Sequence, residues 1–158
     1  MNIKRQAFFA LTSIAILITA CKDKKAEEEK TAFEQRSRAL IENHIQLLNA
    51  HDLKGISAQY SPKARISASE WKGVTTGVAG ADQVFHLEFH LSPDAKYLVD
   101  NLIVKDSTVV VEYDVVGLKD ATNGIRYDVR RSGIFKTDGS RIISEATYTN
   151  PLYYHNGN

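Results

Sequence analysis

The sequence is short of several features, and each shortage excludes a class of protein. It has a single cysteine among 158 residues, so no intramolecular disulfide can form and the fold must be held by its hydrophobic core alone. Its net charge is only +1, and it lacks the basic face that a nucleic-acid partner needs. It has no internal repeat and only one low-complexity stretch. We therefore expect one ordinary domain that does not bind nucleic acid.

Long apolar runs are also scarce, and the one at the N-terminus is too short for a comfortable membrane span. It covers residues 7–20, follows Lys4 and Arg5, and is typical of a secretory signal. It ends in "LITAC", with Ala20 directly before Cys21. This ending resembles the lipobox of bacterial lipoproteins, in which the peptide is cut before the cysteine and the thiol carries lipid. An ordinary signal peptide with a chance cysteine is the alternative.

Four segments follow from this interpretation. They are a lipoprotein signal peptide at 1–20, a charged tether at 21–32 after the lipidated Cys21, a domain at 33–154 and a tail at 155–158. Removing residues 1–20 takes away two basic residues and no acidic ones, so the net charge changes from +1 to −1. The predicted location is the bacterial cell envelope, with a lipid anchor in a membrane and the domain facing the periplasm or the exterior.

The first half of the domain predicts helices. Asp52 is the expected N-cap of a short second helix that includes Tyr60 and is ended by Pro62. A strand is expected at 64–69, a glycine-rich loop at 72–82, and a third helix at 82–91 with Val84, Phe85, Leu87 and Leu91 inward. The long first helix is indicated by residues at helical spacing, which form one apolar stripe with two polar members: Phe33, Ser37, Leu40, Ile41, His44, Ile45 and Leu48.

The second half alternates with period two and predicts four long strands. The runs lie at 96–106, 107–117, 124–136 and 140–150, and turn-forming residues separate them. Helices followed by a strand meander predict an α+β fold, with three helices packed on one face of a curved antiparallel sheet. Alternation turns Glu112, Asp114, Arg126, Asp128 and Arg130 to the outer face. The residues expected to face the helices are Val109, Val111, Tyr113, Val115, Ile125, Tyr127, Val129 and Phe135.

Several stretches together resemble one known family. They are "LLNAHDLKGISAQYSPKARI", the glycine-rich loop with its helix, "VDNLIVKDSTVVVEYDVVG" and "GIFKTDGSRIISEATYTNP". They are similar to the nuclear transport factor 2 superfamily, in particular its SnoaL-like and ketosteroid-isomerase-like members, from about Glu34 to Tyr153. The resemblance implies a cystatin-like roll whose conical sheet, closed by helices, forms one deep pocket. That pocket is an active site in some members and a binding or assembly surface in others.

The resemblance also places the family's catalytic groups where this chain has other residues. The tyrosine donor of the first helix corresponds to His44, the general-base aspartate falls near Ala68, and the second oxyanion donor falls at Arg131 or Ser132. We therefore expect a binding protein without the usual acid–base set. The alternatives are an isomerase, cyclase or hydratase that uses His44 and Glu145 as catalytic candidates, and a protein-interaction module.

The pocket set combines strand alternation with the register that the resemblance implies. In one interpretation, Arg131 and Glu145 simply pair across the hairpin and His44 is a satisfied interior histidine. In the other, Arg131 recognises a small polar or anionic ligand and His44 donates or carries a proton. The residues expected to line the pocket are His44, Tyr60, Phe85, Tyr113, Tyr127, Arg131, Glu145 and Thr147.

No metal and no cofactor are expected. His86 and His90 stand four apart on the third helix with Asp82, but "HLEFH" is not the HExxH motif of zinc proteases. His51 and His155 are predicted to lie on the surface. The expected partners are a small hydrophobic or amphipathic molecule and a membrane through the lipid anchor only; a homodimer stays open.

Overall fold

The computed structural model describes the backbone of residues 3–70 and 73–156, and the side chains of residues 24–70 and 73–150. The chain divides into two compact units, Met1–Phe33 and Glu34–Asn158. In the first unit, the charged stretch is helical and carries two ion pairs, Lys24–Glu28 and Lys25–Glu29. The two partners of each pair lie one helical turn apart. Within the described residues, no helix has the length and hydropathy needed to span a bilayer.

Three helices and six strands make up the described fold. The helices are α1 (Ile3–Ala50), α2 (Leu53–Ala58) and α3 (Gly77–Leu91). The strands are β1 (Tyr60–Ala68), β2 (Thr75–Thr76), β3 (Lys96–Lys105), β4 (Thr108–Lys119), β5 (Arg126–Thr137) and β6 (Ile142–Asn156). The four predicted long strands correspond to β3 to β6.

Most of the predicted stripe of the first helix is buried as expected, and Phe33 and Leu40 are half-buried. Ser37, Ile41, His44, Ile45 and Leu48 all lie in the interior of the second unit. Ser37 is tolerated there because its hydroxyl shares a hydrogen bond of 2.6 Å with the hydroxyl of Thr137 at the end of β5. The apolar face of α1 is therefore fastened to the sheet by a polar contact as well as by packing.

The short second helix begins as predicted but ends earlier. The Asp52 side chain accepts a hydrogen bond from the Gly55 amide at 2.9 Å, which is the expected N-cap. The helix ends at Ala58, and Tyr60 already begins β1, so the prediction that Pro62 ends the helix was wrong. Pairing of Tyr60 with Ile142 of β6 replaces the last expected helical turn.

The third helix begins about one turn before its predicted start, at Gly77 in the segment that we interpreted as a loop. Its glycines serve close packing rather than flexibility. Gly77 has φ +66°, and a Cβ there would lie 2.4 Å from the Pro62 carbonyl oxygen. A Cβ on Gly80 would lie 2.8 Å from the Cβ of Thr75. These contacts hold α3 tightly against β1 and β2.

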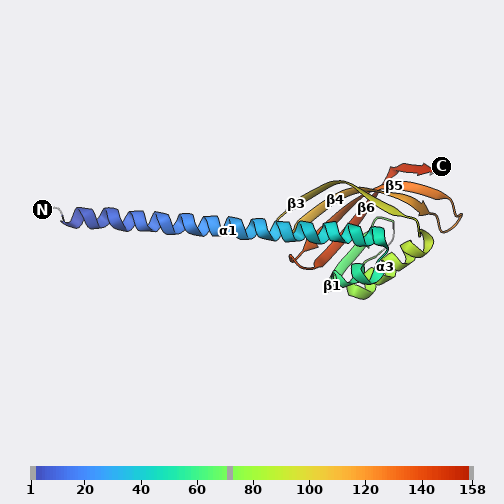
Figure 1. The fold of residues 1–158 in the computed structure, drawn as a ribbon, viewed down its shortest axis with the longest axis horizontal. Coiled ribbons are helices and arrows are strands. Elements are labelled where there is room, and N and C mark those ends of the chain that lie inside the picture. Colours follow the sequence, from blue (N-terminus) through green and yellow to red (C-terminus); the bar gives the residue numbers. More distant parts are fainter. Residues whose placement is uncertain (1–2, 71–72, 157–158) are drawn as a thin grey trace. The chain divides into compact units, whose positions relative to one another are not determined.

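The strands form one curved, mixed sheet in the order β2-β1-β6-β5-β4-β3. Four of the described pairings are antiparallel, as expected, but β1 and β6 run parallel, with Ala68 opposite Thr147. The sequence pattern missed this pairing because its two strands are distant along the chain. Figure 1 shows α3 and the C-terminal part of α1 on one side of the curved sheet, which confirms the α+β prediction.

The two faces of the sheet separate as alternation predicted, with one exception. Val109, Val111, Tyr113, Val115, Val129 and Phe135 are buried against the helices, whereas Ile125 is 54% exposed. Ile125 precedes β5, so its direction is not fixed by strand pairing. On the outer face, Arg130 forms ion pairs with Asp114, at 3.2 Å, and with Asp100.

Candidate functional site

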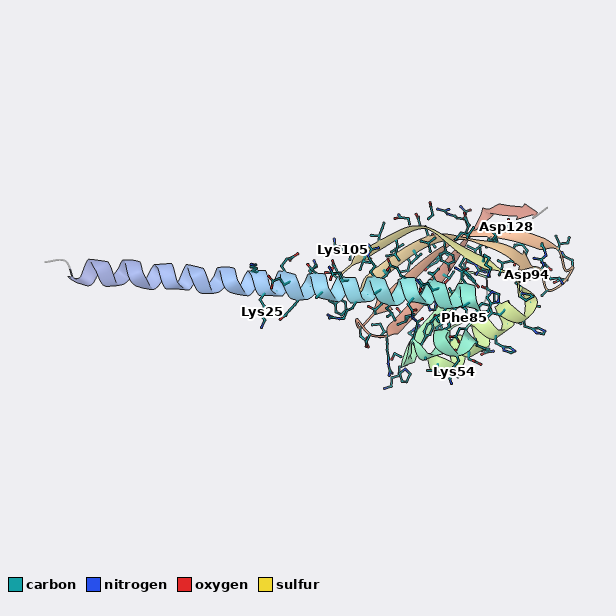
Figure 2. All side chains as sticks on the ribbon, viewed as in Figure 1. Lys25, Lys54, Phe85, Asp94, Lys105 and Asp128 are labelled. Carbon is teal, nitrogen blue, oxygen red and sulfur yellow. The ribbon has the colours of Figure 1, made fainter. Side chains whose placement is uncertain are left out.

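A pocket of about 540 Å³ opens between the inner face of the sheet and α3. Apolar and aromatic side chains make up most of its wall, including Phe85, which Figure 2 labels on α3 close to the C-terminal part of α1. Charged side chains are few. Those that line it are Glu70, Glu88, Lys119, Arg131 and Glu145.

Arg131 is the centre of a half-buried ion cluster. Its Nη1 atom lies 3.0 Å from Glu88 Oε2 and 3.3 Å from Glu88 Oε1, and its Nε atom lies 3.3 Å from Glu70 Oε1. Tyr97 donates its hydroxyl proton to Glu88 as well. Burial is the largest single influence and would lower the pKa of Arg131, but the charges around it, with Glu88 foremost and Glu70 among the others, together outweigh burial. The pKa is therefore raised and the guanidinium stays charged.

The proposed pairing of Arg131 with Glu145 across the hairpin is wrong. Arg131 stands opposite Thr149 in the β5–β6 ladder, whereas Glu145 stands opposite Phe135. At about 3.4 Å per residue, four residues separate the two by roughly 14 Å along the strand. Glu88 from α3 occupies the pairing position instead.

Glu145 lies at the floor of the pocket and is held by two hydroxyl groups. Tyr60 donates to Glu145 Oε2, and the Thr147 hydroxyl donates to Oε1 at 3.1 Å. Burial raises the pKa of Glu145, and these two hydrogen bonds oppose the rise without cancelling it. The result is a pocket carboxyl group that accepts a proton more readily than an exposed glutamate.

Tyrosine hydroxyls surround this carboxyl group and stay protonated. Burial, reinforced by the Glu145 charge, raises the pKa of Tyr60 well above its usual value. Burial also raises the pKa of Tyr113, which lines the same pocket, and the charge of Glu145 adds to the rise. Both tyrosines are therefore hydrogen-bond donors at any physiological pH.

His44 does not line the pocket, contrary to the prediction. It is fully buried behind the pocket wall, with the rings of Tyr60, Phe85 and Phe135 at centroid distances of 5.6 to 5.8 Å. Its Nδ1 atom shares a hydrogen bond of 2.7 Å with Gln59 Oε1, while Nε2 has no partner among the described residues. Burial lowers the pKa of His44 to about 4, so it is neutral near pH 7 and remote from any ligand.

Tyr60 was also expected to line the pocket, and it lies behind the wall too. Its side chain is 1% exposed, and its hydroxyl reaches the pocket only through Glu145. Six members of the predicted set do line the pocket: Phe85, Tyr113, Tyr127, Arg131, Glu145 and Thr147.

None of the remaining histidines with described side chains lines the pocket. His86 and His90 are exposed on α3 with parallel rings 6.4 Å apart, and the described residues contain no group of three His, Cys, Asp or Glu side chains suited to a metal ion. His51 is not a plain surface residue, because it stacks on Phe89 at 4.4 Å and contacts the Ala95 carbonyl oxygen at 3.1 Å. The side chains of His155 and Trp71 lie outside the described residues.

Sequence reasoning missed the role of Glu88. It assigned Leu87 to the inner face of α3, yet Leu87 is 59% exposed and Glu88 points to Arg131. The signal was present, because Ala81, Phe85 and Glu88 follow helical spacing on one stripe. A glutamate in an otherwise apolar stripe indicates a buried cation opposite it. Arg131 is a basic residue that alternation places on the inner face of the sheet.

A second hollow, of about 880 Å³, lies on the outer face of the sheet. Its described lining includes Glu112, Asp114, Asp128 and Arg130, with Tyr148 as the one aromatic residue among them. Apolar walls with a few convergent polar groups are typical of small-molecule sites. We therefore place the candidate functional site in the inner pocket.

Comparison with known proteins identifies relatives of this fold. A family model described as a SnoaL-like domain matches residues 41–145. The enzyme SalBIII, described as epoxide hydrolase/cyclase-like with a role in pyran ring formation in the polyether salinomycin, is similar in structure with a TM-score of 0.69. It is 16% identical, and the match covers 78% of this chain and 98% of that one.

Two further solved structures share the fold. A putative ketosteroid isomerase from Kribbella flavida has a TM-score of 0.63 at 15% identity, with 79% of this chain and 85% of that chain covered. An NTF2-like protein of unknown function from Cytophaga hutchinsonii has a TM-score of 0.58 at 18% identity, with 73% and 91% covered. A search of curated proteins found no match. At these identities the structural likeness establishes the fold.

Proposed function

Because the chain belongs to the SnoaL-like domain family, whose folds enclose one pocket, we propose that it is a lipid-anchored exported protein that binds a small amphipathic molecule in that pocket. The observation that carries the proposal is the combination of an apolar wall with a polar floor. Phe85, Tyr127 and Phe135 supply apolar surface, and Glu145 and Thr147 supply hydrogen-bonding groups. A ligand with an apolar body and one polar end satisfies both.

The strand residue at the family's general-base position supports binding over catalysis. Ala68 lines the pocket there and carries no titratable group. His44, the other candidate, is buried behind the wall. A pocket without a base at the usual position can hold a ligand without transforming it.

Filling the pocket at Ala68 should abolish ligand binding. We expect the purified wild-type chain to release a small molecule on denaturation, detected by mass spectrometry, and Ala68→Phe to release little of it. Ala146→Phe is the matched control, because Ala146 is the neighbour of Thr147 on β6 and does not line the pocket. Circular dichroism checks that both variants are folded. Equal release from wild type and Ala68→Phe, or none from wild type, would contradict the proposal.

The proposed anchor is Cys21, and its removal should leave the protein without lipid. In a bacterial host, we expect the wild-type chain to partition into detergent and to carry acyl groups on an N-terminal peptide that begins at Cys21. Cys21→Ala should remain an uncleaved precursor, because cleavage requires the modified cysteine. Phase partitioning and peptide mass spectrometry measure both properties. Aqueous partitioning of the wild-type chain would exclude the anchor.

An acid–base enzyme is the second candidate, because Glu145 is a buried carboxyl group with a raised pKa in the pocket wall. Such a group suits proton transfer during epoxide opening or isomerisation, the chemistries named for two structural relatives. The candidates separate in one assay. Turnover of an epoxide or ketone probe that is lost in Glu145→Gln favours the enzyme, and binding without turnover favours the binding protein.

A further inference from the structure

We propose that the ligand of this pocket carries a protonated amine, which Glu145 binds, and that the pocket discriminates against carboxylates. The inference rests on the proposed binding function and adds the charge of the ligand. It replaces the expectation that Arg131 recognises an anion, because the contacts of Arg131 oppose that expectation.

The charge of Arg131 is already matched by carboxylates, so Arg131 attracts an anionic ligand only weakly. Its guanidinium already faces two carboxylates, at 3.0 Å for Glu88 and 3.3 Å for Glu70. The side chain of Arg131 is 13% exposed, and those of Glu88 and Glu70 are 20% and 30% exposed, so water screens these pairs only partly. The cluster of three side chains therefore carries a net negative charge in the wall of the pocket.

Glu145 adds a third carboxyl group to the lining, and the charge of Arg131 acts on it only from a distance, lowering its pKa by less than burial raises it. Both of its carboxyl oxygens accept hydrogen bonds from hydroxyls, and no ion pair to Glu145 is present among the described residues. The only other basic side chain in the described lining is Lys119, which is exposed. A buried carboxyl group that lacks a cation is stabilised in its charged form by a cationic ligand.

The aromatic wall suits the same ligand. Tyr97, Tyr113 and Tyr127 all line the pocket, and the rings of Tyr97 and Tyr113 lie 6.2 Å apart. Aromatic faces attract cations through their quadrupoles, and they bury an apolar body at the same time. An amphipathic amine therefore finds a carboxyl partner, aromatic faces and apolar contact in one cavity, whereas a carboxylate meets repulsion from the acidic groups.

Three probes with one apolar body and different charges test the inference: 4-phenylbutylamine, 4-phenylbutanol and 4-phenylbutyrate. Isothermal titration with the full chain in a mild detergent measures their affinities, and Ala68→Phe gives the binding that does not involve the pocket. We expect the amine to bind wild type at least about tenfold more tightly than the carboxylate, with the alcohol between them. Glu145→Gln should lower the affinity for the amine by about tenfold or more and that for the alcohol by much less, because glutamine keeps a hydrogen-bonding group and loses only the charge.

The outcomes separate the inference from the proposed function. A carboxylate that binds as tightly as the amine, or an amine affinity that Glu145→Gln leaves unchanged, overturns the inference while pocket binding stands. Absence of Ala68-dependent binding for all three probes contradicts both. The comparison of the three probes on wild type needs no variant, so it decides the question even if Glu145→Gln folds poorly.

Discussion

Arg131→Met should lower the free energy of unfolding by about 3 to 5 kcal/mol, because it leaves two partly buried carboxylates without their cation. Arg131 contacts both Glu88 and Glu70, and Tyr97 donates to Glu88 on its other side. For a domain of this size, the loss corresponds to a fall in Tm of roughly 10 to 20 °C. Thermal denaturation followed by circular dichroism measures it. Adding Glu88→Gln to Arg131→Met should recover part of the loss, because it removes one of the unpaired charges.

The preceding residue supplies the control. Arg130 is also an arginine with two acidic partners on β5, but its partners Asp100 and Asp114 have side chains that are 63% and 46% exposed. Exposed ion pairs contribute little to stability, so Arg130→Met should shift Tm only slightly. Equal losses of stability in the two variants would contradict the prediction, because they would show that the Arg131 cluster stabilises the fold no more than an exposed ion pair does.

His44→Phe should change how stability depends on pH. The unfolded histidine takes up a proton near pH 6.5, whereas the folded one resists until about pH 4, because burial lowers its pKa. The stabilisation of the folded state by neutral His44 is therefore complete above pH 6.5 and is lost as the pH falls to 4. The loss is about 3 kcal/mol, at roughly 1.4 kcal/mol for each unit of pKa. Urea unfolding at several pH values between 7.5 and 4 measures it for both proteins.

The curves of unfolding free energy against pH for the wild type and His44→Phe should approach each other or cross as the pH falls. At pH 7, we expect His44→Phe to be less stable by about 1 to 3 kcal/mol, because the Gln59 carbonyl oxygen loses its partner. Near pH 4, the wild type has lost its advantage. Glu145 acts in the opposite direction, since its raised pKa disfavours the folded state as the pH rises, but this effect is common to both proteins and cancels in the difference. His86→Phe, at an exposed position, should follow the wild type throughout. A variant His44→Phe that keeps the wild-type pH dependence would contradict the assignment.

The fold prediction rested on periodicity within single helices and strands. It failed where the structure depends on contacts that such periodicity does not encode. The stripe around Ile41 and the alternation around Val111 repeat within single elements, so the sequence alone located β4 and the part of α1 that follows Phe33. It did not predict that α1 begins as early as Ile3. The parallel pairing of β1 with β6 depends on contacts between distant segments. The glycines of α3 misled for a different reason, because Gly77 and Gly80 are required by close backbone approach and not by a loop.

Only part of the site was predicted from the sequence. Alternation fixes which face of the sheet a strand residue occupies, but it does not fix how deeply that residue lies. Arg131, Glu145 and Thr147 were placed correctly on the inner face. His44 lies on the predicted stripe of α1, yet Phe85 and Phe135 pack over it and separate it from the pocket. Depth depends on the sizes of side chains from several elements, and no spacing within one element encodes it.

The pairing of β1 with β6 also has a consequence for the order in which the protein acquires its pocket. Ser67 of β1 and Glu145 of β6 meet at the pocket floor although 78 positions separate them in sequence. Closing so long a loop is entropically costly, and such pairings form late in folding. Because β6 is the last of the described strands to be synthesised, we expect that a nascent chain cannot hold a ligand in this pocket until β6 has left the ribosome.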